Sequence, residues 1–478
     1  MKVKKIVFIV ALLLILCGIF YCLPYKNTVE LYINGEKFIL SSTDENREFD
    51  LKTLSSTRDS YVKVTTNGKT NVKVNGKRVF KYIKNNIGKI AINEDNKIEI
   101  EIKFGTNKKA TKYVINTLPS TFLEYDTKNN GDNYDGIYYM STYSLADQTS
   151  YIFNLNSNGE VLYYKSVEGF CSQFRHEISK SGKDRFVYTA QDLSDDKTVD
   201  MNNIYGKFVV MDENYKVIDE ARYITEREDE KTYTIFEYID DYHYLMTSSY
   251  KSYVDDIEGF DKVMLTQNNI EEVENGKVIF KWESEEHKEL YDYTDTSTFT
   301  SEDTNDYLHI NKIIIDPVDG NIIASFRNIS TILKIDRKTG DIIWSLGGKK
   351  DDFGLTLDEM FNYQHSLSFT SDHSLMIFDN GDNRPLLGIK NESKVVKIKL
   401  DEKNKKVENY KAYKLNGVYS MAMGSVQVID EENDVFLVTY GTGIFNNGPV
   451  ALIDFKNNKN LFEFNLHSNK MMFSSEKE

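Results

Sequence analysis

The sequence predicts an all-β protein, a six-bladed β-propeller preceded by a small β-sandwich domain and an N-terminal transmembrane helix. The chain has 32 Tyr, 27 Phe and only 5 Pro in 478 residues, and its short alternating runs are typical of β-rich globular proteins. A polar turn followed by an apolar residue also recurs every 54 to 65 residues. Repeats of this length hold about four strands each, as propeller blades do, whereas two unrelated β-domains would not explain the interval. The apolar residues that mark the repeats are Val161, Val217, Val278, Ile342, Val407 and Leu461.

Residues 1–25 predict a membrane anchor. Lysines at positions 2, 4 and 5 precede an apolar run from Ile6 to Leu23, whose length is close to the roughly 20 residues that cross a bilayer. Lysines on this side favour a cytoplasmic N-terminus. No small-residue cleavage site follows the run, so we predict a single-pass anchor in the cell membrane in preference to a cleaved signal peptide. In either case the rest of the chain is exported, as an anchored extracytoplasmic domain or as a secreted protein.

Residues 26–118 predict the small β-sandwich domain, and residues 119–478 predict the propeller. Within the first range, strand-like runs are separated by the hairpin signals Ile33-Asn34-Gly35, Thr66-Asn67-Gly68 and Val74-Asn75-Gly76. Its last run, from Lys97 to Lys103, alternates apolar and charged residues. This domain either forms a homodimer contact or spaces the propeller from the membrane.

Charge and cysteine content limit the partners and the covalent structure. A net charge of −15 opposes binding to nucleic acid and to anionic lipid surfaces. An anionic substrate therefore needs a local cationic pocket. Cys171 is the only cysteine after residue 25, so a disulfide within the exported part is excluded and stability must come from packing.

The first strand of each repeat starts at a position that can be aligned between repeats. The aligned residues are His176, Thr234, His309, His365 and Ser425. The innermost strands of a propeller run along its axis, so equivalent strand starts form a ring around one mouth of the central channel. Residues far apart in sequence should therefore converge at that mouth.

Two hairpins are predicted to carry polar groups at this mouth. Val318 lies midway between His309 and Arg327, inside the turn Asp316 to Gly320, so two antiparallel strands joined there set His309 opposite Arg327. The same reasoning pairs His365 with Asn380 around the turn Ser371 to Ser374.

These residue types favour recognition of an oxyanion. Three histidines facing one channel could bind zinc, but a fixed guanidinium beside a dication is repulsive, so we predict no metal. The planar fork of Arg327 suits a tetrahedral oxyanion. His309 would donate a hydrogen bond or a proton. His365 would act as a nucleophile, because a histidine with an ordinary pKa of about 6.5 is largely neutral at pH 7.

The sequence resembles the bacterial arylsulfate sulfotransferases, exported six-bladed propellers with a small N-terminal β-domain. The resemblance covers roughly Asp135 to Gly443 and is strongest from Trp282 to Arg384. The motifs that carry it are Lys281-Trp-Glu283 with His287, His309-Ile-Asn311, Ser325-Phe-Arg327, Lys334-Ile-Asp336 to Gly340, Trp344 to Gly348, Gln364-His365, and Asp379-Asn380-Gly381 followed by Arg384.

This resemblance implies that His365 takes a sulfuryl group from a phenolic sulfate ester as a transient sulfohistidine and passes it to a phenol by a ping-pong route. No nucleotide sulfate donor and no cofactor takes part. His309 and Arg327 match residues that hold the sulfuryl oxygens, and His309 can supply a proton to the departing phenolate. We add Asn311 and Asn380 as candidate substrate-binding residues. Asp379 and Asn380 either orient the His365 ring or cap turns.

One departure from the family pattern concerns Thr234. The family carries a further active-site histidine before a motif like Ile239 to Leu245, and Thr234 stands at that position here. Either His176 replaces it as a substrate-binding residue or the alignment is displaced by one blade. If neither holds, the site lacks one donor. Two rival functions remain open, a propeller that has become a surface binding module and a metal-dependent hydrolase.

Overall fold

The computed structural model describes residues 28–33, 36–41, 47–53, 61–63, 70–79, 88–89, 97–104, 109–118, 122–131, 134–144, 149–191, 206–224, 227, 231–255, 257, 259–382, 390–442, 450–467 and 470–478. The predicted anchor, residues 1–25, lies outside them. Within these ranges no helix is long and apolar enough to span a bilayer. Contacts divide the chain into two units, Met1–Glu124 and Tyr125–Glu478.

The first unit has two sheets in its described residues. One has the order β2 (Glu36–Ser41), β1 (Thr28–Ile33), β4 (Tyr61–Lys63), β7 (Gly88–Lys89). The other has the order β3 (Arg47–Thr53), β9 (Thr111–Thr117), β8 (Lys97–Phe104), β5 (Thr70–Val74), β6 (Lys77–Val79). The hairpin predicted at Asn75-Gly76 joins β5 to β6, and both residues have the positive φ that a two-residue turn needs. The signal at Thr66–Gly68 falls outside the described residues.

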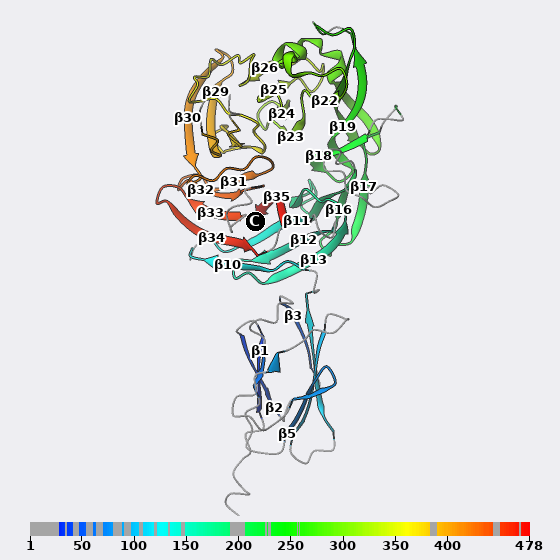
Figure 1. Ribbon diagram of the computed structural model, residues 1–478, viewed down its shortest axis with the longest axis vertical. Coiled ribbons are helices and arrows are strands. Elements are labelled where there is room, and N and C mark those ends of the chain that lie inside the picture. The colour runs from blue at the N-terminus through cyan, green and yellow to red at the C-terminus, as the bar shows by residue number, and fades with distance from the viewer. Residues whose placement is uncertain are drawn as a thin grey trace, which may run out of the picture. The chain divides into compact units, whose positions relative to one another are not determined.

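The second unit has six antiparallel sheets in its described residues, which follow one another around a ring (Figure 1). Three of them contain four strands in chain order. The first has β14 (Phe174–Ile178), β15 (Asp184–Gln191), β16 (Gly206–Met211) and β17 (Val217–Ala221). The second has β18 (Lys231–Asp240), β19 (His243–Val254), β20 (Val263–Glu274) and β21 (Lys277–Glu283), and the third has β23 (Ile310–Ile315), β24 (Ile322–Phe326), β25 (Thr331–Ile335) and β26 (Ile342–Leu346). The short strand β22 (Thr304–Asn305) pairs with β20.

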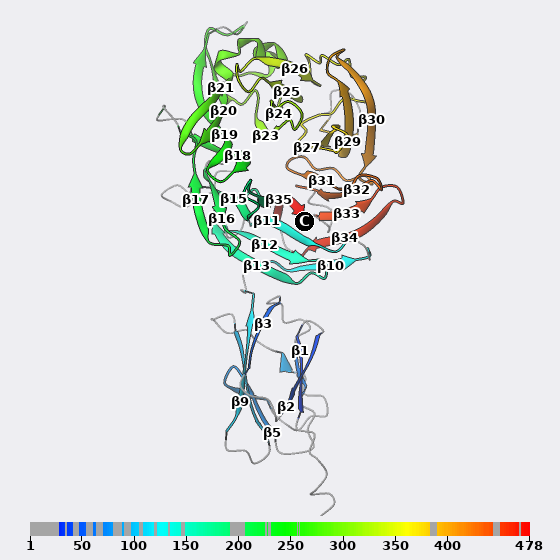
Figure 2. The same cartoon turned by 180° about the vertical axis from the view of Figure 1, so that it is seen from behind.

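Two of the other three sheets combine segments that are distant in sequence. The fourth sheet has β27 (Leu367–Phe369), β28 (Leu375–Asp379), β29 (Lys394–Asp401) and β30 (Lys406–Lys414). The fifth has β31 (Ser425–Asp430), β32 (Val435–Thr439), β33 (Val450–Asp454) and β34 (Lys459–Leu466), followed by β10 (Tyr125–Asn129). The sixth has β35 (Lys470–Lys477), followed by β11 (Ile137–Ser144), β12 (Thr149–Asn156) and β13 (Val161–Glu168). The view from behind shows β10 beside β34 and β35 beside β11 (Figure 2). These two pairings close the ring.

The marker residues of the predicted repeat lie at similar places in the six sheets. Five of them lie first or second in the outermost strand of their sheet, with the predicted polar turn before them. The sixth, Leu461, is the third residue of β34, and β10 pairs outside that strand. The connection from β21 to β23 contains three 3₁₀ helices, η1 (Ser284–Glu286), η2 (Lys288–Tyr293) and η3 (Thr296–Thr298).

The hydrophobic core lies between successive sheets. One cluster joins the β18–β21 and β23–β26 sheets and includes Trp282 and Phe326. The next joins the β23–β26 and β27–β30 sheets and includes Trp344. A buried ammonium group interrupts this second layer, because Lys334 on β25 is only 2% exposed and its Nζ atom contacts Asp316, Asp319 and Glu402.

Candidate active site

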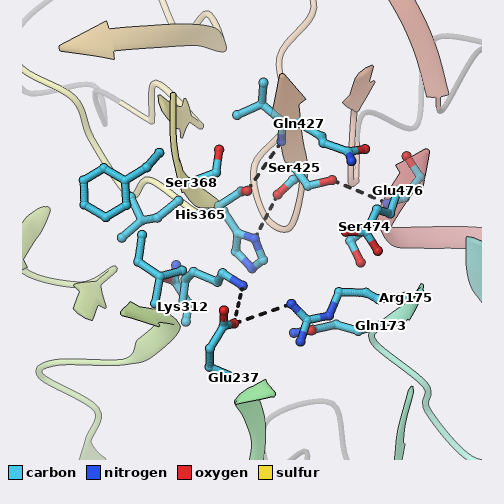
Figure 3. A pocket seen from close by; sticks show the side chains of 18 of the residues that line it. Gln173, Arg175, Glu237, Lys312, His365, Ser368, Ser425, Gln427, Ser474 and Glu476 are labelled. Carbon is cyan, nitrogen blue, oxygen red and sulfur yellow. Dashed lines mark hydrogen bonds and ion pairs between the residues drawn. The ribbon is translucent and has the colours of Figure 1, made fainter. Parts of the chain in front are cut away.

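A cavity of about 340 Å³ lies where the innermost strands of all six sheets meet (Figure 3). Its apolar wall comes from β23, the turn after it, β27 and β31, through Ile314, Ile315, Pro317, Leu367, Phe369 and Val426. Its polar wall comes mainly from β14, β18 and β35, through Gln173, Arg175, Glu237, Ser474, Ser475 and Glu476. His365, Asn311 and Lys312 also line it. Residues separated by 300 positions in the sequence therefore share one pocket.

His365 is held at this cavity by its backbone and by its ring. Its amide donates to the Phe378 carbonyl (2.9 Å), and the Phe378 amide donates to the Ser366 carbonyl (3.2 Å). Two residues thus oppose one, which is a β-bulge, a device that re-aims side chains. The Nδ1 atom of His365 lies 2.9 Å from the Gly424 carbonyl oxygen. A carbonyl only accepts, so Nδ1 carries the proton and Nε2 carries the lone pair of the neutral ring.

The environment keeps the His365 ring neutral. Burial lowers its pKa to about 3, the hydrogen bond to Gly424 opposes this, and the positive charges of Arg327, His309 and Lys312 lower the pKa further. A neutral imidazole with its proton fixed on Nδ1 is a competent nucleophile through Nε2.

His309 and Arg327 face each other across the predicted hairpin. Ile310 pairs with Phe326, and the Arg327 amide donates to the His309 carbonyl at 3.0 Å, so the predicted pairing is confirmed. The Nδ1 atom of His309 donates to Asp306 (2.6 Å). The guanidinium of Arg327 lies 4.7 Å from the centre of the Tyr363 ring and donates to the Asn328 side chain and the Met421 carbonyl. Met421 belongs to the segment that also presents Gly424 to His365.

Three residues near this mouth have a left-handed backbone conformation. His309, Tyr363 and Met423 have φ values of 56°, 55° and 61°, a left-handed conformation that costs free energy for residues other than glycine. Each lies one or two residues before an inner strand or before His365. Such strain persists only where the surrounding contacts hold it, and it is commonest at functional sites.

The predicted pairing of His365 with Asn380 is wrong. The bulge at His365 brings Phe378 opposite it, and Asn380 instead donates its side-chain amide to the carbonyls of Ser420 and Met423. Asn380 thus fixes the segment that carries Gly424, and it does not line the cavity. Asp379 accepts from the amides of Asn362 and Gly381, so it caps turns and does not orient the His365 ring.

The other predicted residues divide into two groups. Asn311 lines the cavity, and its amide nitrogen donates to the carbonyl of Gln364, directly before His365 (2.6 Å). His176 lies in β14 outside the cavity lining, where its ring contacts Asp184 and Glu478 and stacks on Tyr139. Thr234 lies in β18 where the ladder to β19 is interrupted between Tyr233 and Phe236. The structure therefore brings Asn311, but not His176, to the nucleophile.

Sequence reasoning missed four residues of the site. Gly424 has φ of 97°, and a Cβ atom there would meet the Phe378 ring at 2.4 Å, which no sequence motif announces. Lys312, Arg175 and Glu237 line the cavity. Lys312 is a charged residue inside the otherwise largely apolar strand β23, a readable signal, whereas Arg175 and Glu237 lie in strands with several other polar residues.

Comparisons with known proteins agree with this geometry. The family model of Arylsulfotransferase (ASST) matches residues 123–474, more than half of the chain. The comparison with curated proteins gives no match. Two similar solved structures are a protein of unknown function from Bacteroides caccae (11% identity, 71% of this chain and 98% of that one, TM-score 0.41) and the periplasmic gluconolactonase PpgL from Pseudomonas aeruginosa (8% identity, 72% and 99%, TM-score 0.36). The family match covers the inner strands β14, β18, β23, β27 and β31 together with His309, Arg327 and His365, and it ends within β35. The chain belongs to the arylsulfotransferase family.

Proposed function

We propose that the protein is an aryl-sulfate sulfotransferase that moves a sulfuryl group from a phenolic sulfate ester to a phenol by a ping-pong route through a sulfohistidine at His365. The observation that carries this proposal is the buried neutral ring of His365, whose Nδ1 proton is fixed by the Gly424 carbonyl beside the cations Arg327 and Lys312. Membership of the arylsulfotransferase family supports sulfotransferase activity in general. No nucleotide sulfate and no cofactor enters the scheme.

In the first half-reaction the lone pair on Nε2 of His365 forms a bond to sulfur. The bond from sulfur to the aryl oxygen breaks, and its electron pair leaves with that oxygen as a phenolate. The ring keeps its Nδ1 proton, donated to Gly424, so the product is an imidazolium sulfonate. Because cations surround this ring, its positive charge is unfavourable, and the sulfuryl group is poised to transfer again.

His309 and Arg327 stabilise the groups that change charge. A phenol has an ordinary pKa of about 10, so its anion leaves slowly unless it is protonated. We assign that proton donation to His309, whose Nδ1 is held by Asp306. Arg327 stabilises negative charge growing on the sulfuryl oxygens, by analogy with phosphoryl transfer. In the second half-reaction a phenol oxygen attacks sulfur, the bond to Nε2 breaks, and the phenol proton passes to His309.

A second cavity gives a place for the aryl groups. It has a volume of about 350 Å³, and its lining includes Phe299, Tyr307 and Tyr363. Its lining also includes Asp306 and Asn328, the partners of His309 and Arg327. Aromatic side chains pack well against phenol rings, and we propose that donor and acceptor enter here.

The finer architecture and location are part of the same proposal. We infer that the six sheets are the blades of a six-bladed propeller, because consecutive strands fill each sheet and β35 and β10 close the ring. We infer that the two sheets of the first unit form a β-sandwich. Residues 1–25 would anchor the protein in the cell membrane with both units outside, and the first unit could supply a homodimer contact.

The test is transfer between two phenols by the purified protein. We expect 4-nitrophenyl sulfate alone to release nitrophenolate slowly, and added phenol to accelerate the release with formation of phenyl sulfate. Ping-pong kinetics would give parallel lines in double-reciprocal plots against donor at several phenol concentrations. No transfer with any phenol tried would overturn the proposal and favour a surface binding module.

The pH dependence of the donor step offers a separate check on His365. Its neutral form is present above its pKa of about 3, so we expect the single-turnover release from 4-nitrophenyl sulfate to lose nothing through this group between pH 7 and pH 5. A histidine with an ordinary pKa of about 6.5 would lose nearly tenfold per pH unit below that value. Rapid-mixing measurements across this range decide between the two.

A further inference from the structure

The cavity holds charged groups that the reaction scheme above leaves unused. Lys312 on β23, Arg175 on β14, Glu237 on β18 and Glu476 on β35 all line it, on the side toward which the His365 ring points (Figure 3). Charged groups are rarely buried in a channel without a partner of opposite charge. These four residues therefore need an account of what they balance.

Lys312 is the member of this group that faces His365. Asn311 is an extra residue in β23, because Ile310 pairs with Phe326 and Lys312 pairs with Ser325. This bulge lies at the point where Asn311 and Lys312 both line the cavity. The side chains of Lys312 and His365 point toward one another in Figure 3. The charge of Lys312 also lowers the pKa of His365.

Ion pairs position the two cations of the cavity lining. Lys312 and Arg175 share one carboxylate, Glu237, each at 3.5 Å. Arg175 also lies 3.3 Å from Glu177, yet its buried Nε atom has no hydrogen-bond partner among the described residues. Burial and the neighbouring Glu177 raise the pKa of the Glu476 carboxyl. Among the lining residues, Lys312 and Arg175 are thus held around one shared carboxylate, Glu237, while Glu177 pairs with Arg175 from outside the lining.

We propose that Lys312 is a further catalytic residue, whose ammonium group contacts the sulfuryl oxygens while the sulfur is bound to Nε2 of His365. This inference rests on the function proposed above. Glu237 holds the ammonium from the other side, and Arg175 holds Glu237. Arg327 then meets the sulfuryl group from the mouth of the channel and Lys312 meets it from inside.

The physical reason lies in the burial of the nucleophile. Negative charge grows on the sulfuryl oxygens as the aryl oxygen leaves, and in a site screened from water only fixed cations compensate for it. Burial lowers the pKa of Lys312, and Glu237 opposes this. An anion at His365 also favours the ammonium form, so binding and charging support each other.

The test compares three variants in single-turnover donor reactions. We expect Lys312→Met to slow nitrophenolate release by about 100-fold and Lys312→Arg to stay within about tenfold of the wild type. The control is Lys477→Met, another lysine on an inner strand, whose ammonium contacts the carbonyls of Asp135 and Glu478 and which does not line the cavity. We expect that control to react at the wild-type rate.

A series of donors separates Lys312 from His309. Loss of a proton donor matters more when the leaving group is poor, so a His309→Gln change should affect phenyl sulfate more than 4-nitrophenyl sulfate. Loss of a cation beside the sulfuryl oxygens should slow both donors by the same factor. A Lys312→Met variant that reacts like the wild type, or that is selectively slow with phenyl sulfate, would overturn the assignment.

Binding of inorganic sulfate separates this inference from the proposed function. We expect calorimetric titration to show sulfate binding by the wild type and by Lys477→Met, and none by Lys312→Met at the same ionic strength. If the wild type transfers sulfuryl groups but Lys312→Met binds sulfate equally well, the role of Lys312 fails and the function stands. If no transfer occurs but sulfate binding depends on Lys312, the oxyanion site stands and the function fails.

Discussion

Replacing His365 with alanine should abolish sulfuryl transfer, with a loss of at least about 10⁴-fold in kcat, because removal of a nucleophile leaves only the contribution of binding. The ring is buried, its Nδ1 proton is fixed by Gly424, and its pKa is lowered to about 3, so the variant loses the oriented neutral nitrogen that attacks sulfur. Nitrophenolate release with and without phenol measures the loss. Mass spectrometry of the wild type held with donor alone should show an adduct of one SO₃ that the variant lacks.

Two further variants distinguish the chemistry of His365 from its structural role. His365→Gln keeps an amide able to donate to Gly424 but offers no nucleophilic nitrogen, and we expect it to be folded and inactive. His467→Ala removes an exposed histidine paired with Asp126 and should leave the rate unchanged. Residual phenol-stimulated transfer in both His365 variants would rule out the sulfohistidine. If the wild type and the His365 variants bind the ligand equally well and none of them turns it over, a binding module is favoured.

Replacing Lys334 with methionine should destabilise the second unit by about 3–5 kcal/mol, the usual cost of removing one partner from a buried ion pair. Its ammonium contacts Asp316 on the turn after β23, at 2.8 Å, and Glu402 after β29 in the next sheet. The carboxylate of Asp316 is fully buried, so the change leaves it with His373 as its remaining side-chain partner within the described residues. Urea denaturation followed by circular dichroism measures the loss.

A surface lysine supplies the matched control for Lys334. Lys411 pairs with Asp434 and is 52% exposed, and exposed pairs contribute at most about 1 kcal/mol. Acid should act in the same direction as the Lys334 change. Lys334 and the other partners of Asp316 hold the pKa of its carboxyl below its usual range, so its stabilisation is present at neutral pH and is lost as the pH falls through the lowered pKa. Equal urea midpoints for the two lysine variants would contradict the prediction.

The fold was predictable because the turn residues recur in the sequence with the period of the sheets. A polar turn before the fourth consecutive strand of a sheet recurs at a steady interval in the sequence, and the strand periodicity is set by burial of one face. The sequence could not show the register near His365. The register of the hairpin, with Leu367 opposite Ile377, would set His365 opposite Asp379, and a bulge that adds one residue then brings Phe378 opposite it. Bulges leave no compositional signal as simple as a turn.

The candidate site was predicted where a regular hairpin carries it and missed where the partner is backbone. His309 and Arg327 follow from symmetry about one turn, and the structure pairs them. The acceptor for His365 is the main-chain carbonyl of Gly424. Every residue has such a carbonyl, so the sequence does not show which one accepts. Alignment of strand starts placed His176 too close to the site, because His176 is the third residue of β14, whereas His309 precedes β23 by one residue and His365 precedes β27 by two.

The pairing of β35 with β11 has a consequence for the order of events during synthesis. Four sheets are built from consecutive strands and can form as the ribosome releases them, but the edge of β11 stays unpaired until residues 470–477 arrive. An unpaired edge invites association with other chains. Ser474 and Glu476 on β35 also line the cavity. Until β35 docks, the nascent chain therefore has both an unpaired strand edge and an incomplete cavity lining. One docking event ends both conditions, so the cavity is complete only in a chain whose ring of sheets has closed.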